Sequence, residues 1–151
     1  MRLKINTRIN APLELVQEHF AQDLFEQLNP PFPKAAVLVY EGNYPGARVE
    51  LEIDFLLFKQ KWISEITTVQ KEPDNYSFID EGRQLPFFLK NWHHHHLLLK
   101  KGVQTEIVDD IQFSSGNSLL DLLLYPGLLI QFLYRKPIYK SYFNSLSKSL
   151  R

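Results

Sequence analysis

The sequence predicts an α+β domain in which one long C-terminal helix lies across a seven-stranded antiparallel sheet, with two short helices after the first strand. Segments rich in β-branched and aromatic residues follow one another, with no helical pattern between them, from residue 36 to residue 113. Apolar residues recur at helical spacing twice, before residue 29 and after residue 117. Strands in direct succession pair antiparallel, and two short helices cannot cover seven strands, so the long helix must cover the sheet.

A change of period separates the first strand from the two short helices. Residues 3–9 alternate between apolar and polar side chains, as a half-buried strand does. After Ala11 and Pro12 the apolar residues recur at helical spacing, until Pro30 and Pro31 end the pattern. Turn residues such as Pro, Gly, Asn and Asp then divide the chain into six further predicted strands, at residues 36–40, 47–55, 60–71, 76–81, 91–100 and 104–113.

The long C-terminal helix is predicted to begin after residue 117. Pro126 and Gly127 are expected to break it, and Pro137 to kink it or to begin its last section. The most apolar run, residues 119–134, is interrupted by polar residues and falls short of the ~20 residues that a membrane-spanning helix needs, so we expect it to be buried or interfacial. The helix carries an apolar stripe of Leu129, Phe132, Leu133, Tyr139, Phe143, Leu146 and Leu150.

The composition favours one globular domain over residues 1–151, since 44% of the residues are hydrophobic. Seventeen Lys and Arg residues balance seventeen Asp and Glu residues, so we expect no nucleic-acid partner. The chain has no cysteine, which excludes disulfides, thiolate metal sites and cysteine nucleophiles and fits a cytoplasmic protein. The first residues, MRLKINTRINAP, lack the apolar core of a signal peptide.

Four consecutive histidines occupy residues 93–96, within the strand predicted at 91–100. A hairpin turn at Lys101 and Gly102 would place His94 opposite Asp109 on the next strand. Opposed residues project to one face of a sheet, and the face that carries this pair is the more apolar one, so it is assigned to the interior. The same register turns His93 and His95 toward solvent, opposite Glu106 and Asp110.

Four interpretations of the interior histidines are open. The simplest is a hydrogen-bonded structural pair of His94 and Asp109; the others are the polar end of a ligand cavity, an acid–base site and a metal site. In an acid–base site, His94 or His96 would move a proton and Asp109 or Asp80 would orient it. In a metal site, His94 and His96 would face one ion with Asp109 as third ligand, but nothing like HExxH is present. We therefore expect no metal and no cofactor.

Several segments resemble one protein superfamily over nearly the whole chain. They are INAPLELV after the first strand, WISEI in the middle, and FIDEGRQLPFFLKNWHHHHLL followed by TEIVDDIQF before the long helix. This pattern resembles the START-like, or SRPBCC, superfamily, and within it the bacterial polyketide cyclase/dehydrase-like ligand-binding proteins. The resemblance implies a helix-grip fold, in which a curved sheet wraps around the long helix and encloses a cavity. The matching positions are Trp62, Ser64, Ile66, Phe78, Asp80, Pro86, Phe87, Trp92, His94, His96, Thr105 and Asp109.

The resemblance implies the binding or carriage of an apolar small molecule, such as a lipid, polyketide, quinone or sterol-like compound. Thr105, a small residue on the inner face, is expected to border the space for it. One alternative is a cyclase or dehydratase that uses a His/Asp acid–base pair. Another is a protein that docks to a membrane surface or a partner through residues 119–134, with Leu122, Leu123, Leu128 and Leu129 only partly covered. The residues expected to line the cavity are Trp62, Phe78, Trp92, His94, His96, Ile107, Asp109, Phe132 and Phe143.

Overall fold

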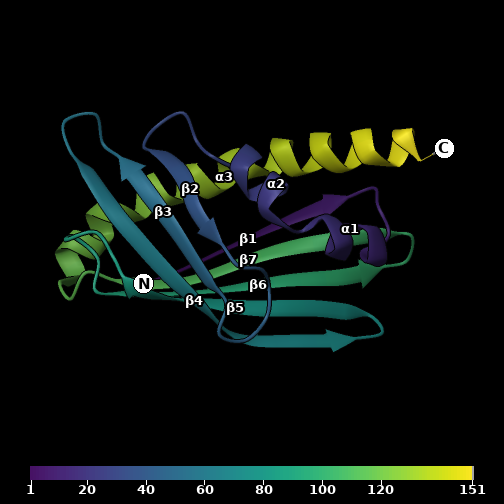
Figure 1. Ribbon diagram of the computed structural model, residues 1–151, viewed down its shortest axis with the longest axis horizontal. Helices are drawn as coiled ribbons and strands as arrows, with labels where there is room; N and C mark the ends of the chain where they lie inside the picture. Colours follow the sequence, from purple (N-terminus) through teal and green to yellow (C-terminus); the bar gives the residue numbers. More distant parts are fainter. Residues whose placement is uncertain (151) are drawn as a thin grey trace.

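The structure, a computed structural model, describes residues 1–150 and has the predicted order of elements. A strand, two short helices, six strands and a long helix follow one another along the chain (Figure 1). The elements are β1 (Arg2–Ile9), α1 (Leu13–His19), α2 (Gln22–Gln27), β2 (Lys34–Tyr40), β3 (Arg48–Asp54), β4 (Lys59–Glu72), β5 (Asn75–Gln84), β6 (Asn91–Lys101), β7 (Gln104–Ser114) and α3 (Ser118–Ser149).

All seven strands form one antiparallel sheet in the order β1-β7-β6-β5-β4-β3-β2. The sheet curls into a half-barrel, and α3 runs along the long axis of the molecule on its concave side (Figure 1). The two short helices connect β1 and β2, the two edge strands of the sheet. The helix α3 packs directly against β1 and β7, and residues of β2 to β6 face it across the remaining interior.

The hydrophobic core consists of two clusters. One contains Val16 of α1, Leu24 of α2 and Tyr139 of α3, and the other contains Leu3 of β1 and Phe132 of α3. Histidines bridge them, because the His96 ring lies 6.0 Å from that of Phe20 in the first cluster and the His94 ring 5.3 Å from that of Phe132 in the second. A polar group thus sits at the centre of an otherwise apolar interior.

The β6–β7 hairpin has a different register from the predicted one. Its turn residues are Gly102 and Val103, and Lys101 pairs with Gln104, so His96 and not His94 lies opposite Asp109. Glycine supplies the positive φ, here 67°, that the first residue of a type II′ turn requires, whereas the second residue can be β-branched. The predicted direct pairing of His94 with Asp109 is wrong by two residues.

The assignment of the two faces of β6 is confirmed, because a shift of two residues leaves every side chain on its original face. His94 and His96 are 3% and 4% exposed, respectively. His93 and His95 are only half-buried and project from the opposite face of the strand.

The C-terminal helix continues through both prolines, so the predicted break at Pro126 and Gly127 is wrong. Each proline removes one backbone hydrogen bond, from the carbonyl four residues earlier. Those carbonyls belong to Leu122 and Leu133, which lie on the exposed side of the helix, where water can replace the lost donor. The packing of Phe132 and Tyr139 on the inner side then holds the helix together across both sites.

The apolar run of residues 119–134 is only partly buried. Phe132 is 3% exposed, whereas Leu119, Leu123 and Ile130 are 67%, 69% and 68% exposed. Within residues 1–150, no helix combines the length and apolar character needed to cross a bilayer.

Candidate functional site

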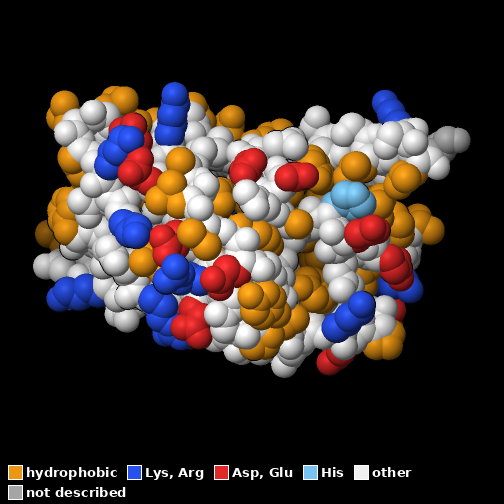
Figure 2. Space-filling view, viewed as in Figure 1, with side chains coloured by type: hydrophobic (Ala, Val, Ile, Leu, Met, Phe, Trp, Pro, Cys, Tyr) orange, Lys and Arg blue, Asp and Glu red, His pale blue; other side chains and the backbone are white. Residues whose placement is uncertain are grey.

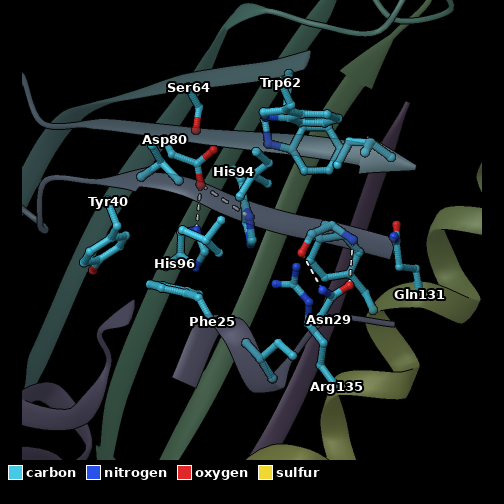
Figure 3. Close-up of a pocket in the computed structure, with 18 of the residues that line it drawn as sticks. Phe25, Asn29, Tyr40, Trp62, Ser64, Asp80, His94, His96, Gln131 and Arg135 are labelled. Carbon is cyan, nitrogen blue, oxygen red and sulfur yellow. Dashed lines mark hydrogen bonds and ion pairs between the residues drawn. The ribbon is translucent and has the colours of Figure 1, made fainter. Parts of the chain in front are cut away.

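A cavity of about 170 Å³ lies between the concave face of the sheet and α3 (Figure 3). Most of its wall is apolar, and its acidic and basic side chains come from β5, β6 and α3. The lining residues are Phe25, Leu28, Asn29, Pro30, Ala35, Val37, Tyr40, Asn43, Val49, Leu51, Ile53, Trp62, Ser64, Ile66, Phe78, Asp80, Trp92, His94, His96, Leu128, Gln131, Phe132 and Arg135.

The alternation of side chains along three adjacent strands builds the polar wall. Residues two apart in a strand project to one face, so each strand contributes every second residue to the cavity. Strand β4 supplies Trp62, Ser64 and Ile66, β5 supplies Phe78 and Asp80, and β6 supplies Trp92, His94 and His96. Because Asp80 is paired with His94 and Phe78 with His96, these side chains meet across the β5–β6 ladder.

Two histidines and two aspartates form a closed buried group. His94 Nε2 lies 3.0 Å from Asp109 Oδ1, and His96 Nε2 lies 2.7 Å from Asp80 Oδ2. The remaining ring nitrogens face the other carboxylate of the group, with His94 Nδ1 3.5 Å from Asp80 Oδ2 and His96 Nδ1 3.9 Å from Asp109 Oδ1. The two imidazole rings lie beside one another, tilted by 32°, with their centres 3.6 Å apart. Asp80 is on the cavity side of the rings and Asp109 is behind them.

Burial decides the charge of His94. Loss of water around the ring lowers the pKa of His94 to about 4, and the neighbouring His96 acts in the same direction, although Asp109 and Asp80 oppose the shift. Burial is the largest single influence on both carboxyl groups and would raise the pKa of each. The hydrogen bonds from His96 to Asp80 and from His94 to Asp109, together with electrostatic attraction from neighbouring groups, outweigh it, and the pKa of each is lowered. At neutral pH the cavity wall therefore holds a neutral His94 beside ionised carboxylates.

Arg135 of α3 brings the nearest permanent positive charge to this group. Its Nη1 lies 3.9 Å from Asp109 Oδ1, and its guanidinium carbon lies 4.1 Å above the centre of the Phe132 ring. The buried Arg135 Nε has no hydrogen-bond partner among the described residues. The hydroxyl of Tyr139, one helical turn further along, is also buried and has no hydrogen-bond partner within residues 1–150, and burial raises its pKa.

Asn29 anchors the edge of the cavity at β2. Its side-chain oxygen accepts a hydrogen bond from the backbone nitrogen of Ala35 at 2.7 Å, and its amide nitrogen donates to the Ala35 carbonyl oxygen. The segment before β2 is thereby fixed to the edge strand. Both residues line the cavity, and Figure 3 labels Asn29.

Six of the nine residues expected from the sequence to line the cavity do so: Trp62, Phe78, Trp92, His94, His96 and Phe132. The expectation is wrong for Ile107 and Phe143, which are 1% and 0% exposed and pack in the first core cluster. Asp109 lies behind the histidines and reaches the cavity only through them. Thr105 does not border the space either, because it is fully buried and its hydroxyl donates to the carbonyl oxygen of Ala11.

Several cavity residues are not among those predicted from the sequence. Arg135 could have been found, because it lies three residues after Phe132 and four before Tyr139 and so shares their side of the helix. Asn29 gave no such signal, since a loop residue reveals its partner only in the fold. Ala35 and Val37 belong to an edge strand whose alternation between half-buried and exposed residues does not distinguish a cavity wall from a packed face.

Comparisons with known proteins show the fold. No family model matches the chain, and no curated protein matches it. The Zhui aromatase/cyclase from Streptomyces sp. R1128 superposes with a TM-score of 0.72 at 14% identity, covering 100% of this chain and 96% of that one. A START superfamily protein from Mycobacterium smegmatis gives 0.65 at 10% identity over 96% and 98%, and Ara h 8.0201 gives 0.62 at 14% over 96% and 98%. The chain thus has the START-like helix-grip fold that the sequence predicts.

Proposed function

We propose that this protein binds a small apolar molecule in the cavity between the sheet and α3 and holds it without transforming it. The observation that carries the proposal is a space with an apolar lining and one polar wall, formed by Asp80, His94 and His96. Sites for small molecules commonly combine an apolar lining with a few polar groups that fix orientation. Proteins named as START and aromatase/cyclase share this fold, which supports the proposal at the level of ligand class.

The size of the cavity narrows the ligand class. A cavity of about 170 Å³ is close to the ~150 Å³ space that holds one benzene molecule, and it is smaller than the roughly 300 Å³ at which sites for drug-sized ligands begin. The described conformation therefore fits a single aromatic ring or a compact molecule of similar bulk. A sterol or a long acyl chain requires the edge strand β2 or the helix α3 to move outward.

A change in cavity volume tests the proposal. Val37 of β2 faces the cavity, whereas the next residue, Leu38, is 52% exposed. We expect a screen of apolar ring compounds to find one that raises the melting temperature of the wild type, with a gain of about 2.7 kcal/mol at a hundredfold excess over its Kd. Val37→Phe should lose this gain and Leu38→Phe should keep it. Equal gains in both variants, or no stabilising compound and no co-purified molecule by native mass spectrometry, would contradict the proposal.

An acid–base enzyme is a second candidate, because a neutral His94 stands between two ionised carboxylates at the cavity wall. Such an enzyme would act as a cyclase or dehydratase on the bound molecule. Incubation of the stabilising compound with the protein, followed by mass spectrometry, distinguishes the two functions. A product that forms with the wild type and not with His94→Gln favours the enzyme, and unchanged ligand favours the carrier.

Docking to a membrane surface is a third candidate, supported by exposed apolar side chains at one end of the molecule. Leu56 and Leu57 at the β3–β4 turn are 82% and 94% exposed, and Leu56 has a φ of 72°, which an apolar residue rarely adopts. Phe87 of the β5–β6 connection, 76% exposed, lies 6.1 Å from Phe58 between ring centres. Figure 2 shows apolar side chains at this end, on the left. Flotation with lipid vesicles tests this function, and a wild type that stays with the soluble fraction excludes it under those conditions.

A further inference from the structure

We propose that Asp80, His94 and His96 form a binding site for a divalent first-row transition-metal ion, of the Zn²⁺ or Fe²⁺ class, in the wall of the cavity. Asp80 Oδ2, one nitrogen of His94 and one of His96 all lie within 4.8 Å of one another. Ligand atoms that each bind one ion at about 2.0–2.2 Å are separated by roughly 3–4 Å. The proposal concerns this chain's own side chains and stands whether or not an apolar ligand binds.

The hydrogen bonding of the group supports a cation on the cavity side. All four ring nitrogens of His94 and His96 face a carboxylate oxygen, but two neutral imidazoles carry only two N–H groups between them. Without a further cation or proton, two nitrogen lone pairs therefore point at carboxylates. In particular, His94 Nδ1 and Asp80 Oδ2 lie 3.5 Å apart as two acceptors when His94 Nε2 carries the proton toward Asp109.

A metal ion beside Asp80 removes this conflict. His94 Nδ1 and His96 Nε2 would bind the ion through their lone pairs, and the protons of both rings would then lie on the nitrogens that face Asp109 Oδ1, at 3.0 and 3.9 Å. His96 Nδ1, which is buried and has no hydrogen-bond partner within residues 1–150, would then carry its proton on the side of Asp109. A carboxylate that accepts the second N–H of a metal-bound histidine is a recurrent arrangement that fixes the ring and raises its affinity for the metal.

The charge balance of the buried group also favours a cation. Asp80 and Asp109 are 9% and 1% exposed, and the nearest permanent positive charge is Arg135, which is 3.9 Å from Asp109. No Lys or Arg side chain forms an ion pair with Asp80 among the described residues. A buried carboxylate without a counter-ion is costly, and a bound cation offsets this cost.

The ligand set indicates the class of metal and what it could bind. Two imidazoles with one carboxylate suit Zn²⁺, Fe²⁺, Co²⁺ or Ni²⁺, whereas Mg²⁺ and Ca²⁺ prefer oxygen ligands. Asp80, His94 and His96 all line the cavity, so an ion held by them would keep a free coordination position toward the enclosed space. An oxygen-bearing ring compound could occupy that position.

Cobalt binding tests the site with a matched control on the same strand. The protein is made without a histidine tag or a nickel column, treated with EDTA, and titrated with Co²⁺ while its visible absorption is recorded. We expect one Co²⁺ per chain, displaced by Zn²⁺, in the wild type and in the His93→Gln/His95→Gln variant, whose substitutions lie on the opposite face of β6. We expect His96→Gln and Asp80→Asn to lose at least about tenfold in affinity, and Asp109→Asn to lose roughly 10–100-fold with its absorption bands retained.

Three outcomes would overturn the proposal. The first is a wild type that gives no cobalt absorption at one equivalent. The second is loss of binding in the His93→Gln/His95→Gln variant, because the surface histidines would then be the site. The third is unchanged affinity in His96→Gln and Asp80→Asn. Circular dichroism checks that each variant is folded, and if His96→Gln is not, Asp80→Asn decides, since its side chain keeps the shape of aspartate.

Discussion

His94 and Asp109 are hydrogen-bonded across the β6–β7 hairpin at 3.0 Å although they are not opposed in the ladder, where His94 pairs with Ile111 and Asp109 with His96. The contact is a diagonal one on a single face of the sheet, and such diagonal neighbours are within reach of long side chains. His94 thereby links Asp109 to Asp80, which lies 3.5 Å from the other nitrogen of its ring and 2.7 Å from His96 Nε2, so the four side chains form one connected group.

Removal of one partner of this diagonal pair should destabilise the protein. We expect Asp109→Asn and His94→Gln each to lower the free energy of unfolding by about 1–3 kcal/mol, because each leaves a buried polar group without its partner. The double variant should lose less than the sum, with a coupling of roughly 0.5–3 kcal/mol. Denaturant melts of the four proteins measure this cycle.

His95→Gln is the control for the cycle, since His95 lies between the two buried histidines in sequence but on the other face of β6. It should change the free energy of unfolding by no more than about 0.5 kcal/mol. Additive effects of Asp109→Asn and His94→Gln would mean that the 3.0 Å contact contributes nothing to stability.

The faces of the strands could be predicted from the sequence, whereas the register could not. Alternation of apolar and polar residues separates the two sides of β6 and is insensitive to a shift of two residues. The register depends instead on the position of the turn. The sequence predicts that Lys101 and Gly102 form the turn, but in the structure Gly102 is the first turn residue and Val103 the second. A single glycine fixes that a turn is present and leaves open which turn position it holds.

The membership of the site was harder to predict than its location. Asp80 was expected only as an orienting residue, because the connection between β5 and β6 is too long for their register to be read from a turn. The β5–β6 ladder places it directly opposite His94, as a member of the buried group. The strands around the histidines were predicted correctly, but the pairing that brings Asp80 to the rings exists only in the folded sheet.

Replacement of Pro126 by alanine should stabilise the protein, because α3 is continuous at this position. Proline in a helix interior costs about 3 kcal/mol relative to alanine, and its restriction of the unfolded chain returns up to about 1 kcal/mol. We expect Pro126→Ala to raise the free energy of unfolding by roughly 1–2 kcal/mol in a denaturant melt. Ser141→Ala, at an exposed position of the same helix, should gain only a few tenths of a kcal/mol. No gain in Pro126→Ala would indicate that the helix is broken there in solution.

Thr105 should matter for the core and not for ligand binding. Its hydroxyl donates to the Ala11 carbonyl oxygen at 2.8 Å, in a fully buried setting that joins β7 to the start of the helical segment. Thr105→Val keeps the shape but removes the donor, so it should cost about 1–3 kcal/mol of unfolding free energy. Compounds that stabilise the wild type should still raise the melting temperature of Thr105→Val. A variant of wild-type stability, or one that has lost ligand binding, would contradict this assignment.

The stability of the metal-free protein should fall between pH 6.5 and about 4 because of His94. Burial lowers the pKa of His94 from 6.5 to about 4, and a histidine with a lowered folded-state pKa stabilises the fold fully above its unfolded value and loses that contribution as the pH falls toward the folded value. The contribution amounts to a few kcal/mol. Asp80 and Asp109, which face His94, have pKa values below the ordinary 3.8 and lose their contribution only below this window.

Denaturant melts at pH 7 and pH 5 in EDTA measure this loss of stability, which should be much smaller in His94→Gln. His95→Gln should retain most of this loss of stability. Loss of water also lowers the pKa of His95, but this side chain is only half-buried, so it contributes less than His94. The same decrease in His94→Gln as in the wild type would show that another group titrates in this range.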